Sequence, residues 1–168
     1  MTCTGKTFNL GFAFLSKEDA PTYTWVLRQV ETWCPRRPDV ILTDRELGLL
    51  KAITIVYPDV HHMLCMVHVQ RNIENYSYSK SKKPSVQASF TQSSMWLLKS
   101  KTREEFETRH SDMTERWRDK WGLMEYLNDV WLVHAEKLVW FLTDQYFHID
   151  NRSTNRYIIF FFVLIFYR

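Results

Sequence analysis

In the first half of the chain, short apolar runs take turns with segments whose apolar residues have helical spacing. Thr7 to Leu15 and Asp39 to Thr43 are apolar runs, and His61 to Cys65 is another short segment of this kind. All three are predicted to be strands. Between and after them, Glu18 to Cys34 and Arg45 to Tyr57 place apolar residues three and four positions apart, as an amphipathic helix does. Strand and helix alternation of this kind predicts an α/β sheet built from crossover units.

The pattern continues with a helix from Val67 to about Tyr76 and then changes. Ser77 to Ser85 is polar and rich in lysine, which predicts a linker, and the next seventy residues have helical periodicity with hardly any strand signal. Ser16 is expected to cap the first helix. The helices after the linker are expected to be joined around Gly122 and around Asn128 and Asp129, and their Trp residues are expected to be buried.

The chain ends in eleven successive apolar or aromatic residues, from Tyr157 to Tyr167. A membrane-spanning helix needs about 20 residues, so we do not expect a membrane anchor or a membrane partner. The run has the length and β-propensity of a core strand, which is one interpretation. The interpretation we prefer is replacement sequence, translated from a shifted frame or an unspliced intron.

Charge is unevenly distributed along the chain. The net charge is +3, but residues 71–103 hold seven Lys and Arg against the single acid Glu74, so this window carries +6 and the remainder −3. Such a window indicates a polyanion partner, or a solvated basic surface. Tyr76 and Tyr78 are interleaved with its lysines, as in proteins that hold phosphates with Lys and stack rings on bases.

Cysteine usage favours a reducing compartment. Cys3, Cys34 and Cys65 are odd in number, widely spaced and without a Cys-x-x-Cys pair, so neither a disulfide framework nor a standard zinc ribbon is predicted. Cys65 and His68 could share a face one helical turn apart, but a closed zinc site needs four ligands and only these two are apparent. No signal peptide is apparent at the N-terminus.

Asp44 is the sharpest local indication of chemistry. It follows the β-branched run DVILT, and functional groups in open α/β sheets gather at the carboxyl ends of strands. A two-metal phosphoryl-transfer site needs several such carboxylates, so one Asp is not a site by itself. Asp44 could equally cap the helix that follows.

Four segments together resemble the Mutator-like element (MULE) transposase domain. They are KTFNLGFAFLSKEDAPTYTWVLRQV, PDVILTDRELGLLKAI, YPDVHHMLCMVHVQRNI and HIDNRSTNR, and they keep the order of that family over most of the chain. The resemblance implies a partial ribonuclease-H-like core, with an α-helical insertion after the third strand-helix unit. On this view residues 1–76 are core, 77–85 a basic linker, 86–150 the helical insertion region and 151–168 an aberrant apolar segment.

The family's catalytic chemistry uses three acids that hold Mg²⁺ or Mn²⁺ for DNA cleavage and strand transfer. Asp44 matches the second acid and is the one expected catalytic and metal-binding residue. The strand that would carry the first acid has no counterpart before MTCTG, and Ile158 stands where the third acid is expected. With one acid, metal binding is expected to be weak and cleavage to be absent.

The resemblance also implies DNA as the partner, in the family the terminal repeats of the transposon. The expected DNA-binding residues are Cys65, His68, Arg71, Lys80, Lys82 and Lys83. Val67 stands where the family commonly has an aromatic residue between the Cys and the His, which alters packing there. The resemblance implies nuclear localisation and leaves a homo-oligomer open, and the alternatives are a domesticated DNA-binding regulatory protein and, less favoured, a tail-inserted membrane protein.

Overall fold

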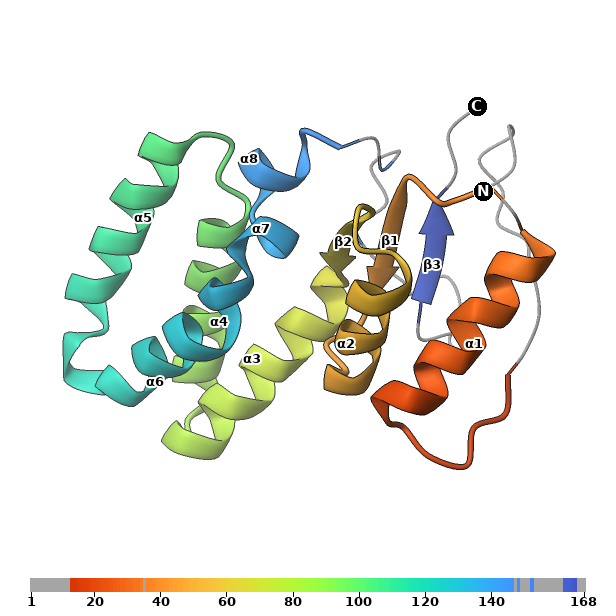
Figure 1. The fold of residues 1–168 in the computed structure, drawn as a ribbon. Coiled ribbons are helices and arrows are strands. Elements are labelled where there is room, and N and C mark those ends of the chain that lie inside the picture. Colours follow the sequence, from red (N-terminus) through yellow and green to blue (C-terminus); the bar gives the residue numbers. More distant parts are fainter. Residues whose placement is uncertain (1–12, 35, 147, 149–151, 153–161, 166–168) are drawn as a thin grey trace. The chain divides into compact units, whose positions relative to one another are not determined.

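A computed structural model describes residues 13–34, 36–146, 148, 152 and 162–165 of the chain (Figure 1). The expected strand from Thr7 to Leu15 therefore lies mostly outside the described residues, and residues 13–15 are not in a strand. The chain forms two compact units, residues 1–63 with 146–168 and residues 64–145.

The first unit contains a small sheet in the strand order β2-β1-β3. The strands are β1 (Val40–Thr43), β2 (His61–Leu64) and β3 (Phe162–Ile165). In Figure 1 the arrows of β1 and β2 point the same way, and β3 pairs antiparallel to β1, with Val40 opposite Ile165. The interpretation of the C-terminal run as a strand is thus confirmed for Phe162–Ile165, and the rest of that run lies outside the described residues.

Helix α1 (Ala20–Trp33) buries Tyr23, Val26, Leu27 and Val30 on the face that its sequence periodicity predicts. Its N-cap is Asp19, whose carboxylate accepts hydrogen bonds from the Thr22 backbone N–H at 3.0 Å and from the Thr22 hydroxyl at 2.6 Å. The expected cap at Ser16 is wrong, because Asp19 is the residue adjacent to the first helical turn and supplies a stronger, charged acceptor.

Helix α2 (Leu47–Val56) links β1 to β2 and so makes a strand-helix-strand unit. The Glu46 side chain caps it by accepting the Leu49 backbone N–H at 2.6 Å, so the helix begins two residues later than expected. Its buried face packs with α1 and β1 into one core cluster. The cluster comprises Tyr23, Leu27, Ile41, Leu49, Ala52, Ile53, Val56 and Tyr57.

The close approach of α1 and α2 depends on Gly48. A Cβ atom at this position would lie 3.0 Å from the Ala20 nitrogen, 3.0 Å from the Asp19 carbonyl carbon and 3.0 Å from Glu46 Oε2. Two of these three atoms belong to the backbone at the start of α1, which cannot rotate away as a side chain can. A side chain at position 48 would therefore push against the backbone where the two helix N-termini meet.

Gly48→Ala is expected to lower the free energy of unfolding by about 1–3 kcal/mol, because the added methyl group forces α1 away from α2. Gly122→Ala is the matched control, since a Cβ there meets no atom within 4 Å. The control should be neutral or more stable by up to ~1 kcal/mol, as Ala is the better helix former. Urea unfolding followed by circular dichroism measures both, and equal effects of the two changes would contradict this account of Gly48.

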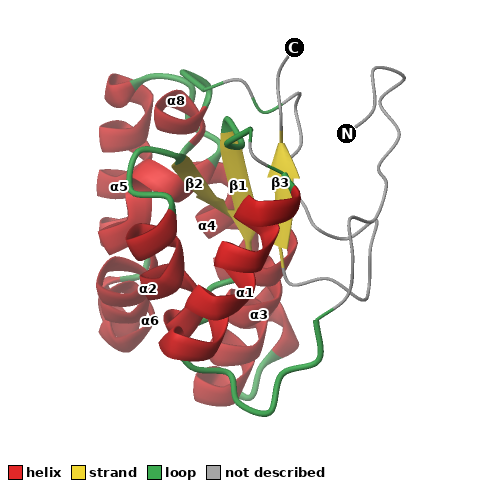
Figure 2. Cartoon of the chain, turned by 45° about the vertical axis from the view of Figure 1, so that its right-hand side comes forward, coloured by secondary structure: helices red, strands yellow, loops and turns green. Residues whose placement is uncertain are grey.

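After Leu64, which ends β2, the regular elements of the second unit are helices (Figure 2). Its longer helices are α3 (Met66–Ser81), α4 (Pro84–Leu98) and α5 (Arg103–Arg116). The remaining elements are short: η1 (Arg118–Lys120), α6 (Trp121–Tyr126), the π-helical η2 (Leu127–Trp131), η3 (Leu132–His134), α7 (Ala135–Leu138) and α8 (Trp140–Thr143).

Helix α3 continues through most of the segment expected to be a linker. Ser77 to Ser81 are helical, and the break between α3 and α4 is confined to Lys82 and Lys83. Lys82 has a φ of 53°, the left-handed conformation that commonly ends a helix. Helix α5 is joined to α6 through Trp117 and the short η1, close to Gly122 as expected. Asn128 and Asp129 lie inside the π-helical η2, so the joint expected there is wrong.

The Trp residues of the second unit divide between core and surface. Trp117 and Trp131 are buried, and Trp117 meets Phe90 edge-on with ring centroids 5.2 Å apart. Trp96 and Trp121 are exposed, which corrects the expectation that these Trp residues are buried. The described chain is therefore mostly helical with a small sheet, and none of its helices is long and apolar enough to cross a bilayer.

Candidate functional site

Asp44 stands directly after β1, at the end of the strand from which α2 departs. Its side chain is half-buried. The alternative in which Asp44 caps α2 is wrong, because Glu46 makes that cap. Asp44 therefore lies at the strand end, where the sequence predicts a functional carboxylate, and it does not cap α2.

Thr43 and His62 fix the two strands beside Asp44. The Thr43 hydroxyl donates its one proton to the Asp44 carbonyl at 2.6 Å and lies 2.7 Å from His62 Nε2. His62 must therefore be the donor in the second bond, which sets the proton on its Nε2. Sequence reasoning missed this pair, because only the packing of β1 beside β2 brings the two side chains together.

Tyr23 presents a buried hydroxyl in the same unit. The residue is 3% exposed, and its hydroxyl has no hydrogen-bond partner among the described residues. Burial raises the pKa of Tyr23 to about 12, and the negative charges of Glu46, Glu18 and Asp44 add to the shift. The neutral phenol is thus the form that the fold accommodates.

Tyr23→Phe is expected to raise the free energy of unfolding by about 1 kcal/mol at pH 8, because it removes a buried polar group that lacks a partner. Between pH 10 and 12 the Tyr23 phenol loses its proton in the unfolded chain but keeps it in the folded chain, which favours unfolding as the pH rises. The parent chain therefore has the full free energy of unfolding below pH 10 and loses part of it as the pH rises to 12. The variant should therefore lose less stability over that interval. Urea midpoints at pH 8 and pH 11 measure this.

Tyr78→Phe is the control for Tyr23→Phe, since Tyr78 is 45% exposed. It should change neither midpoint. A Tyr23→Phe variant less stable than the parent at pH 8 would show that the hydroxyl makes a favourable interaction in the folded chain.

The side chains of the described residues do not assemble the magnesium or manganese site that the family resemblance implies. No group of three or more His, Cys, Asp and Glu residues in the described part of the chain could hold a metal ion. A hard cation needs several oxygen ligands, and Asp44 supplies one carboxylate. The described residues thus do not fit a bound magnesium or manganese ion.

Cys65 and His68 lie at the start of α3, one turn apart as the sequence predicts. Cys65 is the N-cap residue of α3 and is buried, and its side chain makes no capping hydrogen bond to the helix. His68 is half-buried, and its Nδ1 is a buried atom without a hydrogen-bond partner among the described residues. DNA contact by these two residues stays a prediction.

The basic corner, which we define as Lys80, Lys82 and Lys83, lies where α3 ends and α4 begins. All three side chains are exposed, as is that of Arg71 two turns earlier in α3. Lys80 lies 5.4 Å from the ring centroid of Tyr76, and Lys82 lies 5.9 Å from that of Tyr78. The lysines are therefore held near the helix surface.

The two tyrosines of this region differ in their environments. Tyr76 stacks on Tyr126 with centroids 3.7 Å apart, so one of its faces is occupied. Tyr78 is exposed, and it is the ring that could stack on a base.

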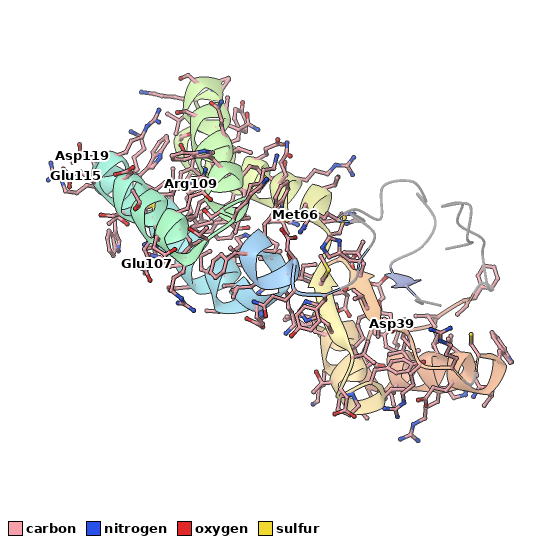
Figure 3. All side chains as sticks on the ribbon, turned by 90° about the horizontal axis from the view of Figure 1, so that it is seen from above. Asp39, Met66, Glu107, Arg109, Glu115 and Asp119 are labelled. Carbon is pink, nitrogen blue, oxygen red and sulfur yellow. The ribbon has the colours of Figure 1, made fainter. Side chains whose placement is uncertain are left out.

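Acidic residues of the second unit are concentrated elsewhere, on α5. Figure 3 shows Glu107 and Glu115 on this helix, with Asp119 close after it. Glu104 and Glu105 occupy its first turn, where a negative charge stabilises the helix by facing the positive end of its dipole. Helix α5 also carries Arg103, Arg109 and Arg116, whereas the basic corner contains no acidic residue.

Comparisons with known proteins agree with the sequence resemblance. The MULE transposase domain family matches residues 1–72, the segment that contains α1, β1, α2, β2 and the start of α3. The match covers less than half of the chain, and over residues 1–72 the chain is similar to this transposase domain family.

Two curated relatives cover most of the chain. Protein FAR-RED IMPAIRED RESPONSE 1 of Arabidopsis thaliana is 28% identical over 157 residues, which is 88% of this chain and 17% of that protein. Protein FAR1-RELATED SEQUENCE 6 of the same plant is 28% identical over 152 residues, which is 85% of this chain and 20% of that protein.

A third relative covers less. PKS-NRPS hybrid synthetase cheA of Chaetomium globosum is 31% identical over 88 residues, which is 50% of this chain and 2% of that protein. The chain spans a fifth or less of the length of these three relatives. No solved structure matches it significantly.

Proposed function

We propose that this chain is a transposase-derived DNA-binding segment that does not cleave DNA by itself. The observation that carries the proposal is the basic corner. Lys83 is the N-cap residue of the fifteen-residue helix α4, Lys82 directly precedes it, and Lys80 lies in the last turn of α3; all three are exposed. Both the ammonium groups and a helix N-terminus attract phosphate. The match of residues 1–72 to a transposase family supports DNA as the polyanion.

We further propose that α1, β1, α2 and β2 are part of a ribonuclease-H-like core and that residues 86–150 are an insertion in it. The strand-helix-strand unit supports this reading, and the helical second unit has the composition expected of an insertion. The proposal extends to a nuclear location and to transposon terminal repeats as the ancestral DNA target. Homo-oligomer formation stays open within it.

A second candidate is a domesticated DNA-binding regulatory protein. The relatives from Arabidopsis thaliana favour it, because they match 88% and 85% of this chain, and one is named for an impaired far-red response. Such a protein needs the basic corner and the helices but no catalytic carboxylates. Salt-sensitive binding to duplex DNA is expected of both candidates and would exclude an inert remnant.

The absence of cleavage is tested with the purified chain and a labelled duplex that carries a terminal-repeat sequence. With Mg²⁺ or Mn²⁺ present, we expect a retarded complex in a native gel and no cut strand in a denaturing gel. Asp44→Ala should leave both gels unchanged, because one carboxylate binds a divalent cation too weakly to activate water. Metal-dependent cleavage that Asp44→Ala abolishes would overturn this part of the proposal.

A further inference from the structure

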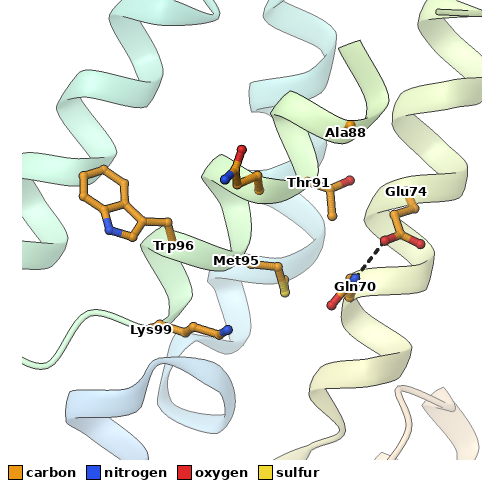
Figure 4. A pocket seen from close by; sticks show the side chains of 8 residues that line it. Gln70, Glu74, Ala88, Thr91, Met95, Trp96 and Lys99 are labelled. Carbon is orange, nitrogen blue, oxygen red and sulfur yellow. Dashed lines mark hydrogen bonds between the residues drawn. The ribbon is translucent and has the colours of Figure 1, made fainter. Parts of the chain in front are cut away.

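A groove of about 490 Å³ lies between α3 and α4 in the second unit (Figure 4). Its volume falls within the range of pockets that hold small ligands. Thr91 and Met95 of α4 are its buried lining, at 5% and 9% exposed. Gln70 and Glu74 line it from α3, and Gln92 and Lys99 line it from α4.

The Thr91 hydroxyl indicates that the groove receives a polar ligand. It is a buried oxygen without a hydrogen-bond partner among the described residues. Two neighbouring hydroxyls on α4 are paired within the helix, that of Ser93 with the Ser89 carbonyl at 3.0 Å and that of Ser94 with the Phe90 carbonyl at 2.9 Å. A buried unpaired hydroxyl is unfavourable unless a ligand or a water pairs it.

Glu74 favours a ligand group that donates hydrogen bonds at this part of the groove. It is the single acid between Arg71 and Arg103, and Gln70 Nε2 donates a hydrogen bond to its Oε1 at 2.8 Å. A carboxylate repels phosphate but accepts hydrogen bonds from the amino groups of bases. Lys99 supplies a cation to the same groove, so the lining offers partners for both a base edge and a phosphate.

We propose that this groove binds one unpaired nucleotide of DNA whose base carries an exocyclic amino group. Thr91 and Glu74 bind the base edge, and Lys99 binds the phosphate. The base must be unpaired, because in a duplex its Watson–Crick edge is already bonded to the opposite strand. This inference rests on the proposed DNA binding and names the nucleotide that this part of the chain would select.

The test compares three labelled duplexes of one sequence by fluorescence anisotropy with the full chain. One duplex is fully paired, one has a single unpaired cytosine and one has an abasic site in place of that cytosine. We expect the unpaired cytosine to raise the affinity about tenfold over both others, as a well-paired base contact does. Thr91→Val should remove this preference and Thr91→Ser should keep it, while both bind the paired duplex like the parent.

Thr108→Val is the matched control, since the exposed Thr108 hydroxyl donates to the Glu104 carbonyl of its own helix at 2.9 Å and is not part of the groove. It should keep the tenfold preference. Equal affinity for all three duplexes would overturn the groove proposal and leave the proposed function standing. A preference that persists in Thr91→Val would assign the base contact to another surface, and failure to bind any duplex would overturn both proposals.

Discussion

Replacing Lys80, Lys82 and Lys83 together with glutamine is expected to weaken duplex DNA binding about a hundredfold or more at ~0.1 M salt. Each lysine that neutralises a phosphate releases condensed counterions, and three such contacts contribute about 2.7 to the slope of log K against log salt. Glutamine removes the charge and keeps a flexible polar side chain that is one atom shorter than lysine. The variant should therefore show both a weaker affinity and a salt slope shallower by about three.

The matched control removes the same net charge from the first unit, by replacing Arg36, Arg37 and Lys51 with glutamine. Arg36 lies 3.9 Å from Asp39, and Arg37 lies 3.8 Å from Glu31 and from Asp59, so these two arginine charges already face carboxylates. We expect a change in affinity of less than about fivefold. Equal losses in the two triple variants would mean that net charge, and not the basic corner, determines binding.

Leu27→Ala is expected to lower the free energy of unfolding by about 3–4 kcal/mol. Leu27 is fully buried in the cluster between α1, α2 and β1, and the shorter side chain leaves a cavity that this compact core fills only in part. Since many small domains are stable by only about 5–15 kcal/mol, this is a large share of the total. Urea unfolding at constant pH gives the midpoint and the slope from which the difference is calculated.

Leu47→Ala makes the same chemical change at a position that is 62% exposed. It should alter the free energy of unfolding by less than about 0.5 kcal/mol. If Leu27→Ala were as mild as this control, the core between α1 and α2 would not be packed as described.

Much of the first unit could be predicted from local sequence patterns. The β-branched run that ends at Thr43 gives β1 because it is apolar on both faces, and the spacing of Leu49, Ile53 and Val56 gives the buried face of α2. The helix starts were predicted less well. Several capping residues lie within a few positions of one another, and only the geometry of the first turn selects Asp19 and Glu46.

The extension of α3 was missed because its sequence is rich in serine, which usually favours turns. In the structure the Ser77 hydroxyl donates to the Glu74 carbonyl at 3.1 Å, and the Ser81 hydroxyl donates to the Ser77 carbonyl at 2.7 Å. These bonds satisfy the hydroxyls within the helix, so the polar segment stays helical up to Lys82.

Asp44 was found from sequence because its signal is local, as it directly follows a strand. The Thr43 and His62 pair, the Tyr23 hydroxyl and the groove lined by Thr91 and Glu74 were not found. Each of these depends on residues from two elements, and their proximity arises only when those elements pack.

The central claim is that the chain binds DNA through phosphate contacts, and a salt titration of duplex binding tests it most directly. The affinity of the purified chain for a labelled duplex is measured by anisotropy at several salt concentrations. We predict that log K falls linearly with log salt, with a slope of about −3 or steeper, as three or more phosphate contacts require. Binding that is undetectable at low salt, or affinity that does not change with salt, would contradict the claim.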